Sequence, residues 1–74
     1  MLFKRYEKAH IQNEWVVRDG YGHRVEGPEP FSEETATIAV TALNQHVTAN
    51  DGVMPQANAA WYVIAKALEA HRAR

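Results

Sequence analysis

Hydrophobic residues recur at steps of three and four along residues 32–49, the period of an amphipathic helix. The stripe consists of Ala36, Ala39, Val40, Leu43 and Val47. Ser32 lies ahead of it as a predicted N-cap, and the two glutamates that follow suit the positive end of the helix dipole. Gly52 suits the left-handed C′ position just beyond the other end. With its flanking residues, the pattern predicts a first helix within residues 31–50.

A second helical pattern covers residues 54–72, with Pro55 expected at the first helical position. Its apolar side consists of Ala57, Ala60, Trp61, Ile64, Ala67, Leu68 and His71, with Val63 at the edge. At about 100° per residue this arc covers roughly half the helix, which is wider than the stripe a surface helix needs. We therefore expect one edge of the arc to face the rest of the chain and the other to be left for a partner.

The residues before the first helix predict strands. Trp15, Val16 and Val17 favour a strand, and Asp19-Gly20 is a strong hairpin signal because glycine reaches positive φ without steric cost. Residues 23–26 then return as a second strand. The prolines of Gly27-Pro28-Glu29-Pro30 end it, since proline is excluded from central strands.

Residues 2–11 fit either a helix or a strand, because their apolar residues have no clean period. We favour a strand that pairs with the hairpin through a turn at residues 11–13, since an isolated two-stranded hairpin is marginally stable. The predicted fold is one α+β domain over residues 1–74. It has a three-stranded antiparallel sheet within residues 1–30 and two helices on one face of that sheet. Trp15, Leu43 and Val47 are expected in one buried cluster.

The composition excludes several classes of protein. The 74 residues include no cysteine, so neither a disulfide nor a thiolate zinc site is expected, which fits a cytoplasmic protein. A net charge of −1 gives no general attraction to nucleic acid or to anionic membranes. No apolar run is long enough to cross a bilayer, and the N-terminus lacks the apolar region of a signal peptide.

Candidate chemistry is sparse. The four histidines are dispersed, and no pair has the spacing of a helical metal motif, so no metal or cofactor is predicted. Ser32 is the only serine and is explained as a helix cap. Glu33 and Glu34 are adjacent on a helix and point in different directions, which does not suit paired acid–base catalysis. We therefore expect no enzyme activity.

Two resemblances follow from these residues. Trp15, Val17, Asp19 and Gly22 match a W-x-V-x-D-x-x-G hairpin. The matched helix start and helix sequence are Ser32, Glu33, Glu34 and Ala42-Leu43-Asn44. This pattern resembles small uncharacterised ββα-type proteins of phages and bacteria; it implies a fold and no activity, and Thr35 replaces their usual alanine. The sheet and helix also resemble the arm-type DNA-binding domain of tyrosine-family phage integrases.

The integrase resemblance implies contacts to nucleic acid through a basic sheet. The matching candidates are Lys4, Arg5, Lys8, Arg18 and Arg24. Nearby acidic residues offset them, which departs from the basic sheet of that family. Our main functional hypothesis is therefore a non-catalytic protein-interaction module that binds a second copy of itself or another protein. The candidate interface residues are Ile38, Ala42, Ala59, Trp61 and Val63. A nucleic-acid-associated accessory protein is the alternative.

Overall fold

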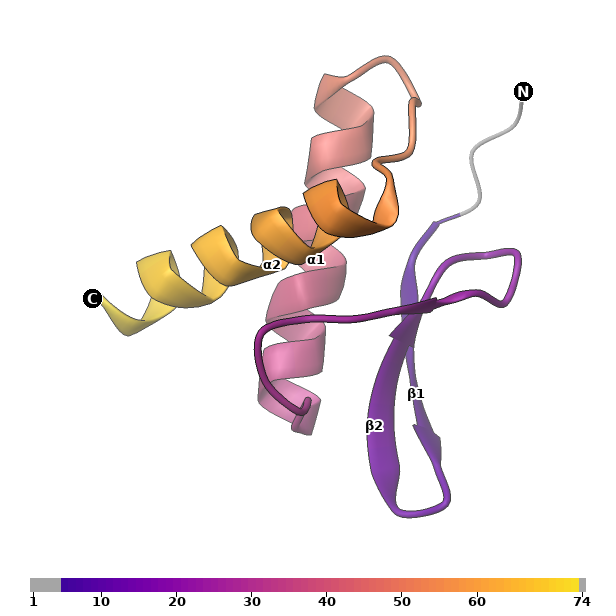
Figure 1. The fold of residues 1–74 in the computed structure, drawn as a ribbon, viewed down its shortest axis with the longest axis vertical. Coiled ribbons are helices and arrows are strands. Elements are labelled where there is room, and N and C mark those ends of the chain that lie inside the picture. The colour runs from indigo at the N-terminus through magenta and orange to yellow at the C-terminus, as the bar shows by residue number, and fades with distance from the viewer. Residues whose placement is uncertain (1–4, 74) are drawn as a thin grey trace.

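The computed structural model describes residues 5–73 and has the predicted α+β order. The elements are β1 (Glu7–Ile11), β2 (Glu14–Arg18), β3 (Arg24–Val25), α1 (Glu33–Ala49) and α2 (Ala57–Arg72). The strands form one antiparallel sheet in the order β1-β2-β3. The first helix packs on β1 and β2, and the second crosses it and reaches β3 (Figure 1). No helix within residues 5–73 is long and apolar enough to cross a membrane.

The β1–β2 hairpin confirms the strand interpretation of the first segment over residues 7–11; residues 2–4 of the predicted strand lie outside the described part. Gln12 and Asn13 close the hairpin with φ of 51° and 66°. Positive φ at both central residues is the mark of a type I′ turn, whose twist matches that of the flanking strands. The turn fixes the register, in which Ile11 pairs with Glu14 and Glu7 with Arg18.

The β2–β3 turn differs from the prediction at its glycines. The left-handed glycine is Gly22, with φ of 91°, and Gly20 does not have positive φ. The cause is Asp19, whose carboxylate oxygen Oδ1 accepts from the backbone N–H of Tyr21 at 2.9 Å and of His23 at 3.0 Å. These bonds organise a wider loop, so β3 begins at residue 24 and covers two residues rather than the predicted four.

The chain leaves the sheet after Val25 and returns at Phe31, which bridges Trp15 on β2. The intervening residues 26–30 contain both prolines and lie outside the ladder, as predicted. Trp15 and Val17 are two residues apart on β2. Their partners, Phe31 and Val25, are six residues apart in the sequence. The excursion carries Gly27 against the Ile64 side chain of α2.

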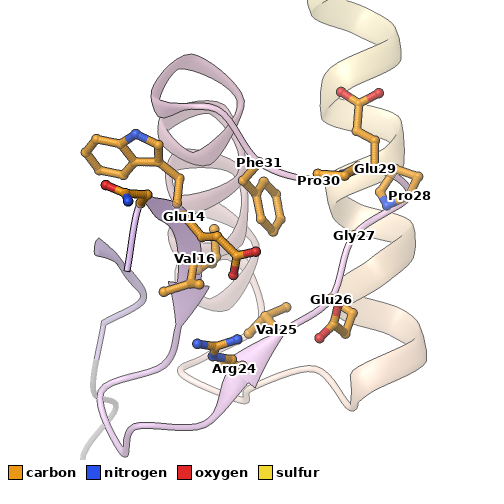
Figure 2. Close-up of a pocket in the computed structure, with 13 residues that line it drawn as sticks. Glu14, Val16, Arg24, Val25, Glu26, Gly27, Pro28, Glu29, Pro30 and Phe31 are labelled. Carbon is orange, nitrogen blue, oxygen red and sulfur yellow. The ribbon is translucent and has the colours of Figure 1, made fainter. Parts of the chain in front are cut away.

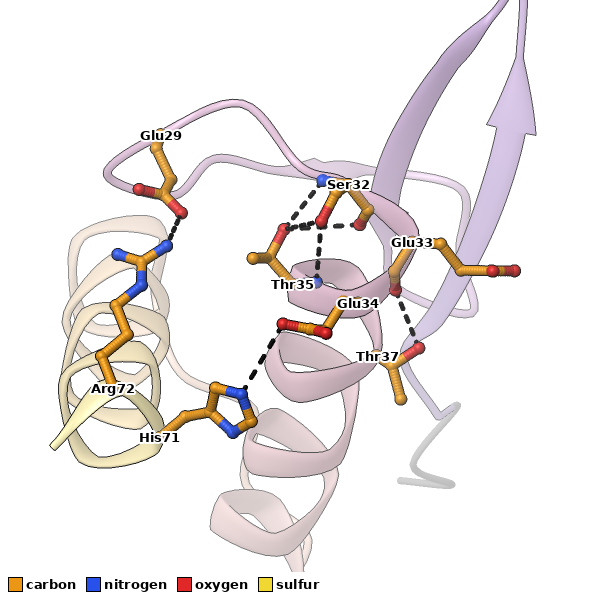
Figure 3. Close-up of polar contacts among 8 residues, drawn as sticks. All are labelled: Glu29, Ser32, Glu33, Glu34, Thr35, Thr37, His71 and Arg72. Atoms are coloured by element: carbon orange, nitrogen blue, oxygen red, sulfur yellow. Dashed lines mark hydrogen bonds and ion pairs between the residues drawn. The ribbon is translucent and has the colours of Figure 1, made fainter. Parts of the chain in front are cut away.

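Caps define both ends of α1. The Ser32 hydroxyl accepts from the Thr35 backbone N–H at 3.2 Å, and the Thr35 hydroxyl accepts from the Ser32 N–H at 2.8 Å (Figure 3). This confirms the predicted N-cap. At the other end Asp51, with φ of 57°, occupies C′, and Gly52 is the next residue, whose N–H donates to the Val47 carbonyl at 2.9 Å. The prediction that Gly52 occupies C′ was therefore wrong by one residue, because the helix ends at Ala49 with Asn50 as its cap.

Replacing Ser32 with Ala is expected to lower the free energy of unfolding by about 1 kcal/mol, because the Thr35 N–H loses its acceptor. Urea unfolding followed by circular dichroism measures the change. Thr41→Ala, at an exposed position of the same helix, is the control and should change stability by less than about 0.5 kcal/mol. Equal stability of Ser32→Ala and wild type would show that the cap contributes nothing.

One hydrophobic core joins the sheet and both helices. Its buried members are Tyr6, Val17, Ala36, Ala39, Leu43, Val47, Ala60, Ile64 and Leu68. Leu43 and Val47 are buried as predicted, but Trp15 is only partly buried at the edge of the cluster. Trp15 is less buried because it pairs with Phe31, just ahead of α1. It therefore lies beyond the end of the helix that covers the sheet.

The second helix also departs from its prediction. It begins at Ala57 with Gln56 as a cap that makes no side-chain hydrogen bond, so Pro55 lies before the helix rather than at its first position. Only Ala60, Ile64 and Leu68 are buried, a stripe narrower than the predicted arc. The difference arises because one helix, α1, and the short β3 are its main contacts, and they cover little more than one row of side chains.

Candidate functional site

Two large aromatic side chains lie exposed next to each other in sequence on α2. Trp61 is 42% exposed and Tyr62 is 58% exposed. At about 100° per residue, Trp61 flanks the buried row of Ala60, Ile64 and Leu68, whereas Tyr62 lies nearly opposite that row. The Lys66 ammonium lies 5.5 Å from the Tyr62 ring centroid, one helical turn further along. We call Trp61 and Tyr62 the aromatic surface.

The structure divides the predicted interface residues among different places. Ile38 and Ala42 line a hollow of about 440 Å³ between the helices, opposite Ala67, Ala70 and His71. Val63 is partly buried against the core, and Ala59 is exposed. The helical rotation puts both on the other side of the buried row from Trp61. Ile38 and Ala42 are thus brought together, whereas Trp61 is separated from Ala59 and Val63.

Sequence reasoning missed Tyr62. The residue falls on the polar side of α2, so it was outside the apolar arc on which the interface was predicted. An aromatic side chain opposite the buried row was the available signal, because such a residue gains nothing from the core and is common at protein interfaces.

A second hollow, of about 550 Å³, lies between β2 and residues 24–31. Its apolar lining includes Val16, Val25 and Phe31 (Figure 2). Glu14, Arg24 and Glu26 also line it, and none of these three forms an ion pair within residues 5–73. The lining thus combines an apolar patch with two carboxylates and one guanidinium.

Side-chain contacts tie the end of α2 to the rest of the fold. The Arg72 guanidinium donates to the Glu29 carboxylate, and the His71 Nε2 atom lies 3.6 Å from a Glu34 oxygen on α1 (Figure 3). The hydrogen bond from Arg72 holds the pKa of Glu29 below its ordinary value. His71 was expected on the apolar arc but is exposed in this pair. Within residues 5–73 no group of three or more potential ligands is placed to hold a metal ion.

The candidate nucleic-acid residues do not form one basic surface in the described part of the chain. Arg18 donates to Glu7 at 3.0 Å, and the Lys8 ammonium lies 3.9 Å from Glu33. Alternation along the strands places Lys8 on the face towards α1, and Arg18 and its neighbour Arg24 on the opposite face. Arg5 is exposed, and Lys4 lies outside the described residues. Nucleic-acid binding therefore stays a prediction without a geometric site.

Comparisons with protein-family models, curated proteins and solved structures find no match for this chain.

Proposed function

We propose that this chain is a small non-catalytic protein-interaction module that works as a homodimer and presents the aromatic surface of α2 to another protein. The observation that carries the proposal is the exposure of Trp61 and Tyr62 on a regular helix. Tryptophan and tyrosine dominate the energetics of protein interfaces, because their large rings bury much apolar area at little cost in side-chain entropy.

The placement of the two rings also supports recognition rather than stability. Neither ring belongs to the core cluster, and a large part of each ring stays exposed in the folded chain. A rigid helix also holds them in a fixed relation before any partner binds, which lowers the entropic cost of binding. A dimer would carry this surface twice, so a partner with two binding segments would bind the dimer more tightly than it binds one copy.

The double substitution Trp61→Ser with Tyr62→Ser tests the proposal. Wild-type and variant proteins are immobilised and exposed to a lysate of the source cells, and the retained proteins are quantified by mass spectrometry. We expect at least one protein to be retained about tenfold more by the wild type, because interface aromatics are typical hot spots. The variant should keep its melting temperature within a few degrees, since both side chains are exposed.

Val53→Ser is the matched control. Val53 is 65% exposed but lies in the link before α2 rather than on the helix. The Val53→Ser substitution removes an exposed apolar side chain without changing the aromatic surface. A set of retained proteins that is the same for wild type, control and double variant would overturn the proposal.

A further inference from the structure

One edge of the sheet is formed by β1, whose backbone has an outward side (Figure 1). In a hairpin closed by a two-residue turn, the last pair, here Ile11 and Glu14, exchanges both hydrogen bonds, and the next pair exchanges none. Every second residue back from Ile11 therefore bonds to β2. The backbone groups of Lys8 and His10 point the other way, to the open edge.

The start of β1 confirms this alternation. Tyr6 lies two residues before Lys8, so its backbone groups also point towards the open edge. Both groups form hydrogen bonds with a side chain outside the sheet. The Tyr6 N–H donates to the Asn44 side-chain oxygen Oδ1 at 2.9 Å, and the Asn44 side-chain Nδ2 donates to the Tyr6 backbone carbonyl at 3.3 Å. Asn44 thus closes the edge at one end as a paired strand would. The turn at Gln12 closes the other end, so among the bonds within residues 5–73 the open stretch is Lys8–His10, with two N–H and two C=O groups.

The side chains along this stretch do not cover it. Lysine on an edge strand normally guards the edge against pairing. Here the Lys8 ammonium donates to the Thr37 hydroxyl of α1 at 2.7 Å and lies 5.5 Å from the Trp15 ring centroid. The His10 ring stacks on the same tryptophan with the centroids 4.8 Å apart. Both side chains are directed onto the inner face of the sheet, so neither of them covers the edge backbone.

We propose that this edge pairs antiparallel with β1 of a second copy, about a two-fold axis at Ala9. In that register Lys8 of each copy exchanges both backbone hydrogen bonds with the second copy's His10. The four bonds use every open group of both edges. The inference rests on the proposed homodimer and names its surface: an edge of this length, closed by Asn44 at one end, is complementary to itself.

The side chains accept this register. Ala9 faces the second copy's Ala9, where a methyl group leaves room for the close approach of a pair that is not hydrogen-bonded. Glu7 is held by Arg18 and lies opposite the second copy's Ile11. No two acidic and no two lysine or arginine side chains come directly opposite each other.

The second copy's strand also ends where the open edge ends. In this register its Ile11 comes opposite Glu7, and its chain reverses at Gln12 and Asn13, before the position beside Tyr6 that Asn44 occupies. A hollow of about 460 Å³ runs along α1 next to that position, and its lining includes Arg5, Val40, Asn44 and Thr48. The aromatic surface of α2 takes no part in the pairing. Because so short a pairing buries less than a standard interface, we expect a dissociation constant on the order of 10–100 µM.

Two substitutions at one position test the edge. His10→Pro removes the outward N–H and leaves the bonds between β1 and β2, because proline is tolerated on an edge strand whose N–H faces away from the sheet. His10→Ala removes the same ring but keeps the N–H. By sedimentation equilibrium at up to about 1 mM, we expect His10→Ala to dimerise like wild type. The dissociation constant of His10→Pro should rise by at least about tenfold, since symmetry removes two of the four bonds.

Amide hydrogen exchange of the wild type gives a second measurement that needs no substitution. We expect the exchange of the Lys8 and His10 amides to slow as protein concentration rises. A Trp15→Phe variant reports on Trp61 alone, and its quenching by iodide should not depend on concentration. Unprotected exchange of both amides in a dimer, or equal dissociation constants of the two His10 variants, would overturn the proposal that β1 forms the dimer interface. Concentration-dependent protection of Trp61 would place the dimer on α2 instead. Loss of the partner retained through Trp61 and Tyr62 is a separate result, so the two proposals fail separately.

Discussion

Replacing Leu43 with Ala is expected to lower the free energy of unfolding by about 2–5 kcal/mol. The side chain is fully buried at the centre of α1, within the cluster that joins the sheet to both helices. Its removal loses the burial of the deleted carbons and leaves a cavity that rigid neighbours fill only in part. In a domain of 74 residues such a loss is a large share of the total stability. Urea unfolding followed by circular dichroism measures it.

Leu43→Met is the matched variant, because it keeps the volume and apolar character and should cost less than about 1.5 kcal/mol. A small effect of Leu43→Ala, close to that of the methionine variant, would contradict the position of this residue between the sheet and α2. It would also contradict the assignment of the buried stripe on α1.

Replacing Gly27 with Val is expected to destabilise the fold by about 1–3 kcal/mol through overpacking. A β-carbon at this position would lie 3.0 Å from the Phe31 Cζ atom and 3.2 Å from the Ile64 Cγ2 atom. Both distances are shorter than ordinary van der Waals contact, and valine adds two further methyl groups. The ring and the α2 side chain would have to move away from each other.

The same unfolding measurement gives a graded test. Gly27→Ala should cost less than Gly27→Val, because the ends of two side chains yield more easily to one methyl group. Glu26→Val introduces the same side chain at the exposed neighbouring residue and should change stability by less than about 0.5 kcal/mol. A valine at Gly27 that is as stable as wild type would mean that the excursion is not held against α2.

The sequence predicted the elements well where periodicity and caps agree. The stripe through Leu43 and Val47, together with Ser32 ahead of it, placed α1 to within a residue. The N-terminal strand was predicted only from the instability of a lone hairpin. Its register depends on positive φ at Gln12 and Asn13, and neither is glycine. The turn was expected at residues 11–13, but its type was not, because neither residue with positive φ is glycine.

Departures from the prediction arise where one side chain or one neighbour decides the geometry. The Asp19 carboxylate widened the β2–β3 loop and moved the left-handed residue to Gly22. The width of the apolar arc on α2 led to a predicted interface that included Ala59, Trp61 and Val63, and the helix places Trp61 on the other side of its buried row from the other two. The narrow contact with α1 leaves Trp61 exposed and turns Val63 inwards, and Tyr62 was outside the pattern. The edge of β1 follows from hydrogen-bond parity and from Asn44, which no sequence period reveals.

Sedimentation equilibrium of the wild-type protein, from micromolar concentration to about 1 mM, tests the central claim most directly. The claim is that this domain associates with a second copy of itself, on which both the proposed β1 edge and the doubled aromatic surface depend. The account predicts a reversible monomer–dimer equilibrium with a dissociation constant on the order of 10–100 µM and no larger species. A single monomeric species at every concentration would contradict it.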